Sequence, residues 1–238
     1  MAAGPFRRVA DAARSLLPRV LWNAVRAAIT AMTTPLRFSA RTGHFRSSLA
    51  GRAVAADGSP LPWYSYPAID FLAARDYAER RVLEFGGGQS TLWWQRRARA
   101  VTTFESDPAW EARLAAGRAA NVELHHMPIE LSDEDCLAAI ARLLEDRRFD
   151  VIVLDGHLRR ELVAVAFDHL APGGAIVLDD AEGYDVQGEI RWRGDCRRID
   201  FFGFAPGVAL RHCTSLVYVG DCFLLRPDVR MPTHDEVA

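Results

Sequence analysis

Strands and helices alternate between residues 80 and 181 of the 238-residue chain, and this alternation limits the fold more than any other feature. Five segments are short and almost entirely apolar, including RVLEF, FDVIVL and AIVL, and segments with helical periodicity lie between them. Strands this apolar are buried on both faces, which is typical of a parallel sheet covered by helices on each side. We therefore predict an α/β, doubly wound, Rossmann-like fold.

The end of the chain departs from this alternation. Two apolar segments, CRRIDFFGF and SLVYVGDCFLL, are separated by the ten residues APGVALRHCT. A connection of this length can form a hairpin, so we expect the sheet to finish with an antiparallel pair. The predicted sheet is thus mostly parallel, with an antiparallel last strand.

Residues 1–52 form a basic segment with a net charge of +8, whereas the other 186 residues carry −10. Within residues 5–32 the arginines fall on one helical face and apolar side chains on the opposite face, and Pro18 is expected to divide the helix. Residues 33–60 are rich in Ser, Thr, Gly and Arg and are predicted to be a linker. We expect a basic amphipathic helical extension and linker over 1–60 and a main domain over 61–238.

Three interpretations of the extension stay open. It packs on the main domain or on a partner subunit of a homo-oligomer, it lies on an anionic membrane surface, or it is an acid-poor transit peptide. Arginines interrupt every apolar run, which argues against a membrane span. Four widely spaced cysteines indicate free thiols in a reducing compartment. We expect a cytoplasmic protein, with peripheral membrane or protein contact through residues 1–52 as the open question.

The loop after the first apolar strand, in VLEFGGGQSTLWW (residues 82–94), is rich in glycine. A dinucleotide fingerprint, G-x-G-x-x-G, would need glycine where Thr91 stands, and a phosphate-binding P-loop would need a lysine, which the chain lacks. What remains is an acid-x-Gly-x-Gly pattern formed by Glu84, Gly86 and Gly88. An acid at Glu84 would repel a pyrophosphate, so the loop suits a ligand that carries a cationic amine.

A second acid, Glu105, ends the next strand 21 residues after Glu84, where a carboxylate can bind a ribose diol. Loop, second acid and strand succession together resemble the class I S-adenosylmethionine-dependent methyltransferases over residues 64–225. The resemblance implies a seven-stranded sheet with its last strand inserted antiparallel. It also implies S-adenosyl-L-methionine as the cofactor, with roles in binding it for Glu84, Gly86, Gly88, Ser90 and Glu105. His126 or Met127 would lie near the adenine.

Aspartates follow two further strands, Asp155 after the fourth and the pair Asp179 and Asp180 after the fifth. Carboxyl ends of parallel strands open onto one crevice, so these side chains should converge. Three carboxylates repel each other unless a cation or a proton joins them, and hard oxygen ligands suit Mg²⁺. The arrangement resembles the metal-dependent O-methyltransferases of the catechol and macrocin types, which implies a metal held by Asp155, Asp179 and Asp180. In those enzymes the metal lowers the pKa of a substrate hydroxyl.

The sequence differs from the catechol-type pattern at the base. That pattern places a lysine three residues after the first metal ligand, and Leu158 stands there. His157 is the predicted substitute for proton removal, beside Asp155 as the other candidate catalytic residue. Two alternatives remain. His157 could only pack against the cofactor. The aspartates could also act without a metal, in which case Asp155 is a base or binds substrate, and Asp179 and Asp180 contact backbone amides of a loop.

We therefore expect a methyltransferase that acts on a small-molecule or glycan hydroxyl. The main domain is acidic, no nucleic-acid signature is present, and no Asn-Pro-Pro-Tyr-like motif of amino-methylating relatives occurs. A non-catalytic cofactor-binding scaffold that acts through the N-terminal segment is an alternative. A nicotinamide-dependent oxidoreductase is a further alternative, which Thr91 and Glu84 disfavour.

Overall fold

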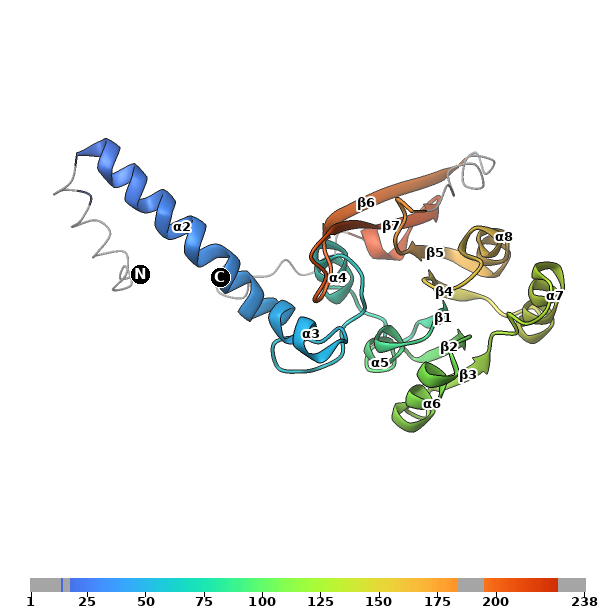
Figure 1. Cartoon of the computed structure of the whole chain (residues 1–238). Coiled ribbons are helices and arrows are strands. Elements are labelled where there is room, and N and C mark those ends of the chain that lie inside the picture. The colour runs from blue at the N-terminus through green and yellow to red at the C-terminus, as the bar shows by residue number, and fades with distance from the viewer. Residues whose placement is uncertain (1–13, 15–17, 184–194, 227–238) are drawn as a thin grey trace.

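The computed structural model describes residues 14, 18–183 and 195–226. Seven strands form one sheet in the order β3-β2-β1-β4-β5-β7-β6 (Figure 1). The first five strands are parallel, and β7 is inserted antiparallel between β5 and β6, which confirms the predicted fold. The strands are β1 (Arg81–Phe85), β2 (Ala100–Glu105), β3 (Val122–His126), β4 (Phe149–Leu154), β5 (Leu170–Leu178), β6 (Cys196–Phe204) and β7 (Arg211–Val219).

Helices cover both faces of the sheet, and alternate residues of each central strand enter two separate cores. On β1, Val82 belongs to the core under α4 and α5, whereas Leu83 and Phe85 belong to the core under α7 and α8. This division explains why the central strands are apolar throughout. The helices are α4 (Tyr66–Ala73), α5 (Gln89–Trp94), α6 (Pro108–Gly117), α7 (Asp133–Leu144), α8 (Arg159–His169) and the 3-10 turn η1 (Phe223–Leu225).

Local signals in the sequence fix several helix starts. The Asp107 side chain accepts hydrogen bonds from the backbone N–H groups of Ala109 and Trp110, and Pro108 is the first residue of α6. Helix α8, by contrast, ends at His169, although glycine, a usual helix stop, comes only at 173 and 174. The reason is that Leu170 already pairs with Phe149 of β4 in the sheet.

The last strand also differs from expectation. Strand β7 begins at Arg211, inside the expected ten-residue connection, and residues 223–225 form η1 instead of the end of a strand. The hairpin connection comprises only residues 205–210. The chain can reverse over so few residues because Gly207 adopts a left-handed conformation with φ of 76°. Pairing of β6 and β7 then runs without a break from Phe204 opposite Arg211 to Cys196 opposite Val219, which satisfies the backbone groups of edge strand β6 that face β7.

The N-terminal extension is more helical than predicted. Helix α2 (Arg19–Thr42) begins after Pro18, as expected, but it continues through Pro35, and α3 (His44–Ala50) follows it. The prediction of a linker at 33–60 is therefore wrong for most of that range. The Phe38 ring packs edge-on against Tyr66 at 5.3 Å between centroids, and this contact stabilises the last turns of α2.

Most of α2 projects away from the main domain (Figure 1). The helix contains no buried residue, so the interpretation that it packs on its own main domain is not supported beyond its last turns. The predicted helix before Pro18 lies outside the described residues, apart from Arg14. No described helix is both long enough and apolar enough to cross a membrane.

Candidate active site

A cavity of about 220 Å³ opens at the carboxyl ends of β1, β2 and β4. This is the edge of the sheet at which the glycine loop was expected to bind its ligand. Most of the predicted site residues line the cavity, and Glu84 is buried in the strand directly before the loop. The lining residues are Trp63, Gly86, Gly87, Gly88, Gln89, Ser90, Glu105, Ser106, Trp110, Met127, Asp155, Gly156 and His157.

Glu84 is a fully buried carboxylate with one unsatisfied oxygen. Its Oε2 accepts hydrogen bonds from the hydroxyls of Thr91 and Thr103, whereas Oε1 has no partner among the described residues. Burial raises the pKa of Glu84 to about 7 from its usual 4.5, and the hydroxyl hydrogen bonds oppose this rise. A buried, unpaired carboxylate oxygen is costly, so a ligand ammonium group that reached Oε1 would relieve this cost.

Thr91, which breaks the dinucleotide fingerprint, connects the loop to this acid. Its hydroxyl donates to Glu84 and accepts a hydrogen bond from the backbone N–H of Gly88 at 3.0 Å. A glycine at this position would leave Glu84 with one donor fewer. Thr91, which breaks the dinucleotide-binding pattern in the sequence, therefore fixes the position of the Glu84 carboxylate.

The three glycines of the loop differ in how much space surrounds their Cα atoms. Gly86 has φ of 94°, and a Cβ there would lie 2.3 Å from the carbonyl oxygen of Asp155. A Cβ on Gly87 would lie 2.8 Å from side-chain atoms of Leu114 and Thr103. A Cβ on Gly88 would meet no described atom within 4 Å, although the residue lines the cavity. Packing thus requires the first two glycines, and Gly88 leaves open space for a ligand.

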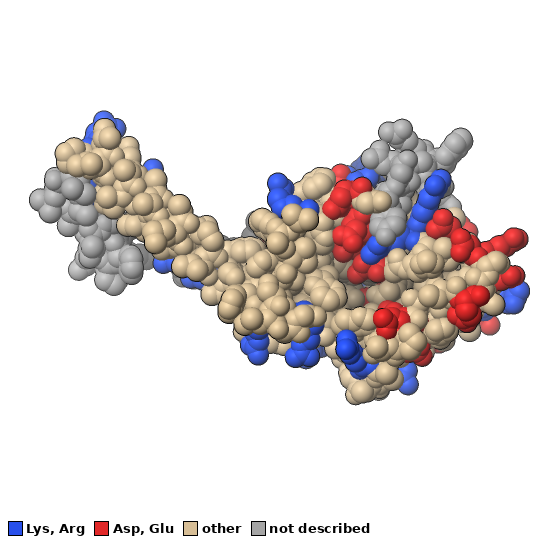
Figure 2. Space-filling model, in the orientation of Figure 1, with Lys and Arg blue, Asp and Glu red and all other residues tan. Residues whose placement is uncertain are grey.

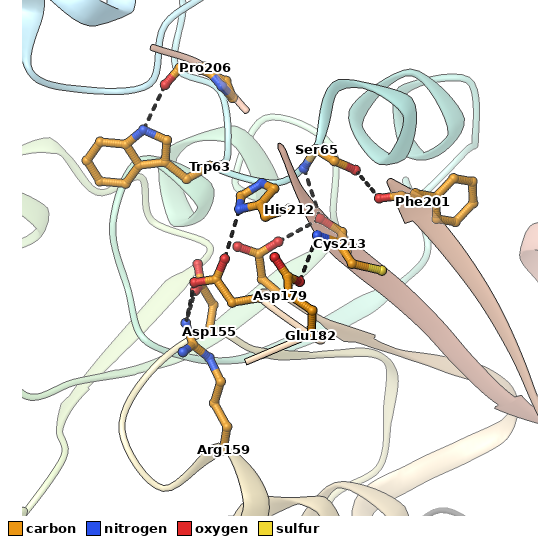
Figure 3. Close-up of polar contacts among 12 residues, drawn as sticks. Trp63, Ser65, Asp155, Arg159, Asp179, Glu182, Phe201, Pro206, His212 and Cys213 are labelled. Carbon is orange, nitrogen blue, oxygen red and sulfur yellow. Dashed lines mark hydrogen bonds and ion pairs between the residues drawn. The ribbon is translucent and has the colours of Figure 1, made fainter. Parts of the chain in front are cut away.

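Glu105 and two tryptophans form further parts of the cavity wall. Oε1 of Glu105 accepts hydrogen bonds from the backbone N–H groups of Ser106 and Asp107 at 2.8 and 2.6 Å, which fixes the carboxylate at the end of β2. The Trp63 and Trp110 rings meet nearly at right angles at 6.2 Å. The Trp63 indole N–H donates to the carbonyl of Pro206 at 3.0 Å, so the β6–β7 connection holds this ring in place (Figure 3).

Of the two residues suggested for the adenine, Met127 lines the cavity and His126 does not. His126 is exposed, and its two ring nitrogens lie 3.1 and 3.4 Å from carboxylate oxygens of Glu111 and Glu130. His157, the predicted base, is an exposed residue in the cavity wall.

The three predicted aspartates lie close enough to influence one another's pKa, but Asp155 already has a cation, Arg159 (Figure 3). Arg159 of α8 donates to Asp155 at 2.6 Å and approaches Asp180 to 3.8 Å. Burial raises the pKa of Asp155 to about 6, and the charge of Arg159 opposes the rise. Burial, together with the nearby Asp155, also raises the pKa of Asp179, which accepts a hydrogen bond from the Thr214 hydroxyl at 2.6 Å.

His212, on β7, completes the cluster and was missed in the sequence. Its Nδ1 lies 2.8 Å from Oδ1 of Asp180, and its Nε2 is buried without a hydrogen-bond partner among the described residues. The hydrogen bond to Asp180 raises the pKa of His212. Among the described residues, Asp179, Asp180 and His212 offer ligand atoms within 4.8 Å of one another, and Asp155 is not part of this group. His212 was expected to lie in a connection. A prediction that started the last strand at Arg211 would have placed His212 next to the aspartates.

Comparisons with known proteins agree with this geometry. Residues 83–181 match the family model described as a methyltransferase domain. Comparison with curated protein sequences gives no match. Among solved structures, the fold is similar to cofactor-bound Rv0187 from MTB, with 22% identity, a TM-score of 0.53, and coverage of 79% of this chain and 96% of that one.

Two solved O-methyltransferases are also similar in fold. TomG from Streptomyces achromogenes, involved in tomaymycin synthesis and solved with S-adenosylmethionine, has 20% identity, a TM-score of 0.50, and coverage of 85% of this chain and 99% of that one. The enzyme from Bacillus cereus, solved with S-adenosylhomocysteine, has 14% identity, a TM-score of 0.50, and coverage of 83% and 97%.

The strand order, the glycine loop at the end of β1 and the family match define the class of this protein. Residues 83–181 contain a methyltransferase domain, and the sheet that surrounds it has the seven-stranded, antiparallel-ended order expected of the class I S-adenosylmethionine-dependent methyltransferases.

Proposed function

We propose that this protein transfers the methyl group of S-adenosylmethionine to a hydroxyl oxygen of a small molecule, with His212 as the general base. The observation that carries the proposal is the Asp180–His212 pair, which leaves the buried Nε2 of His212 without another described partner, close enough to Asp155 of the cavity wall for the two charges to interact. The O-methyltransferases of similar fold support an oxygen acceptor.

The residues of the loop fit the cofactor. Oε1 of Glu84 is available for the ammonium group of the methionine part, and Gly88 leaves room for a ligand against the backbone. Ser90 lines the cavity near the carboxylate position, and Glu105 is held where it can accept hydrogen bonds from ribose hydroxyls. These roles for Glu84, Gly86, Gly88, Ser90 and Glu105 are proposals from geometry and donor chemistry.

Proton removal is the part of the reaction that this chain must perform. A bound S-adenosylmethionine supplies a methyl group on a sulfonium sulfur, which keeps the electron pair of the broken S–C bond. A neutral hydroxyl is a weak nucleophile, and its proton must leave as the new O–C bond forms. With Nδ1–H directed at Asp180, Nε2 of His212 carries the lone pair that accepts this proton. Asp180 then stabilises the imidazolium.

A divalent cation is the second candidate, and it would give His212 a different role. Asp179, Asp180 and His212 could hold the ion, which would lower the pKa of a bound hydroxyl. The predicted ligand Asp155 would first have to leave Arg159. Arg159 contacts both Asp155 and Asp180, and burial favours the neutral form of Asp179, so the carboxylates need no metal ion for charge balance. This favours the metal-free arrangement. A set with one nitrogen ligand also suits Mn²⁺ or Zn²⁺ better than Mg²⁺.

The acceptor atom can be tested with matched pairs of small molecules. The purified protein is incubated with methyl-labelled S-adenosylmethionine and with phenols, catechols and sugars, each beside an analogue in which one hydroxyl is replaced by an amine. We expect label on oxygen only, detected by mass spectrometry and NMR. Label on the amine in preference to the hydroxyl would contradict the proposal. A protein that binds the cofactor but labels nothing, in this panel or in cell extracts, would support the non-catalytic scaffold.

Chelation separates the two roles of His212. In the metal-free proposal, EDTA leaves the rate unchanged, and added Mg²⁺ or Mn²⁺ does not raise the melting temperature. If EDTA abolishes activity and Mn²⁺ or Mg²⁺ restores it, the cation site is correct. Asp179→Asn should then also remove the shift in melting temperature that the metal causes.

A further inference from the structure

Helix α2 exposes a continuous apolar stripe. Leu21, Val25, Ile29, Met32 and Leu36 recur at intervals of three or four residues, so they lie on one face of the helix. Their exposed fractions run from 43% at Val25 to 72% at Met32, and Val20 beside them is 79% exposed. Phe45 and Leu49 of α3 are also exposed. An apolar surface this long usually marks a contact that the isolated chain does not make.

The opposite face of α2 is basic. Arginines at 19, 26, 37 and 41 alternate with Asn23, Thr30 and Thr33 at the same helical spacing. The chain has no acidic residue between Asp11 and Asp57, although seven arginines lie in that interval. In Figure 2 acidic side chains gather on the main domain, and α2 shows an uncharged face with arginines at its edges. The helix thus combines an apolar stripe with an unneutralised positive charge.

This charge pattern selects among partners. A second copy could cover the apolar stripe by pairing α2 with α2, but each helix would then bring only arginines to the pair and no acid to neutralise them. A surface of anionic lipid headgroups supplies the missing negative charge and, directly beneath it, an apolar layer. Trp22, half-buried and located between the two faces, is of the residue type that favours this boundary.

We propose that α2 lies flat in the headgroup region of an anionic bilayer, with the stripe from Leu21 to Leu36 toward the acyl chains and the arginines toward phosphates. The attachment is peripheral. It does not depend on the identity of the methyl acceptor, so it stands or falls separately from the proposed O-methylation.

The test uses the full chain and vesicles of two compositions, pure phosphatidylcholine and three parts phosphatidylcholine to one part phosphatidylglycerol. We expect co-sedimentation with the anionic vesicles only, and we expect it to weaken as salt is raised. Replacement of one arginine by glutamine, in Arg26→Gln or Arg37→Gln, should weaken partitioning roughly five-fold per residue.

A matched pair of double variants tests the apolar stripe. Ile29→Glu with Leu36→Glu places two acids in the stripe, whereas Thr30→Glu with Thr34→Glu places the same charge on the basic face. Both pairs of positions are exposed, so neither variant should disturb folding. We expect the stripe variant to bind at least about ten-fold more weakly than the control variant, because only it loses apolar insertion.

Three results would overturn the proposal. The first is no binding of the wild-type chain to anionic vesicles. The second is equal loss in the two double variants, which would reduce the interaction to charge attraction alone. The third is a dimer in analytical ultracentrifugation that the stripe variant dissociates while vesicle binding is absent, which would assign the stripe to a second copy of the chain.

Discussion

Nδ1 of His212 lies 2.8 Å from Oδ1 of Asp180, and this contact determines which ring nitrogen can receive a proton from a substrate. A carboxylate next to Nδ1 holds the proton there, so the lone pair is on Nε2. The pair combines residues from two distant segments, the end of β5 and the start of β7, which the antiparallel insertion of β7 brings together.

Replacing His212 by alanine should lower kcat by about 100-fold or more, the usual contribution of a general base, and leave cofactor affinity unchanged. The measurement is the initial rate of S-adenosylhomocysteine formation, with affinity followed by calorimetry. Asp180→Asn should also lower kcat, because an amide permits the wrong tautomer of the imidazole. His157→Ala is the informative comparison. If it causes the larger loss of kcat, the base is His157, as the sequence suggested.

Glu84→Gln should raise stability and weaken cofactor binding. The folded-state pKa of Glu84, about 7, is above its usual 4.5, so the buried acid destabilises the fold as pH rises through this interval. At about pH 8 the variant should be about 1–3 kcal/mol more stable than the wild type in urea denaturation, and the difference should vanish near pH 4. Affinity for S-adenosylhomocysteine should fall at least about ten-fold. Exposed Glu130→Gln should change neither quantity, and retained affinity in Glu84→Gln would refute the assigned role.

The two ends of the glycine loop should respond differently to alanine. Gly86→Ala places a Cβ 2.3 Å from the carbonyl oxygen of Asp155 at a positive φ, and should cost at least about 2 kcal/mol of stability. Gly88→Ala meets open space and should change stability by less than about 0.5 kcal/mol, while it weakens cofactor binding. Thermal denaturation with and without S-adenosylhomocysteine measures both effects. Unaltered cofactor affinity in Gly88→Ala would mean that the ligand does not pass this residue.

Arg159→Gln should destabilise the protein because it leaves Asp155 without its cation. Both side chains of this pair are mostly buried, and removal of one partner from such a pair costs about 2–4 kcal/mol. Asp155→Asn in the Arg159→Gln background should recover part of the loss, since the uncompensated charge is then gone. Urea denaturation of the wild type, the two single variants and the double variant gives the coupling free energy between Arg159 and Asp155. Strict additivity of the two effects would show that the ion pair does not contribute to stability.

The sheet could be predicted from the sequence because its central strands are apolar on both faces and its helix starts carry local signals such as Asp107 and Pro108. The cofactor loop could also be predicted, since a few residues close in sequence carry it. The site beyond the loop was predicted less well. His212 pairs with Asp180, which lies 32 residues earlier, and its segment was expected to be a connection. Arg159 lies only four residues after Asp155, but it was treated only as part of a helix.

Two errors share one physical cause. Both the start of β7 and the helix at residues 33–50 are set by contacts with neighbouring elements of the fold, not by the preferences of their own residues. Arg211 is extended because it pairs with Phe204, and α2 continues past Pro35 while Phe38 packs on Tyr66. Amino-acid composition alone predicts a loop at the start of β7 and a linker at residues 33–50, and tertiary contacts override these local preferences.

The contact between α3 and the β6–β7 connection links the N-terminal helices to the segment that carries the proposed base. The backbone N–H of Gly207 donates to His44, and Ser48 donates to the carbonyl of Gly207, five residues before His212. A displacement of α2 and α3 therefore reaches the proposed base through one short stretch of chain, and the same stretch, through Pro206, holds Trp63 of the cofactor cavity. Attachment at α2 is accordingly expected to change KM for the acceptor and KM for S-adenosylmethionine together.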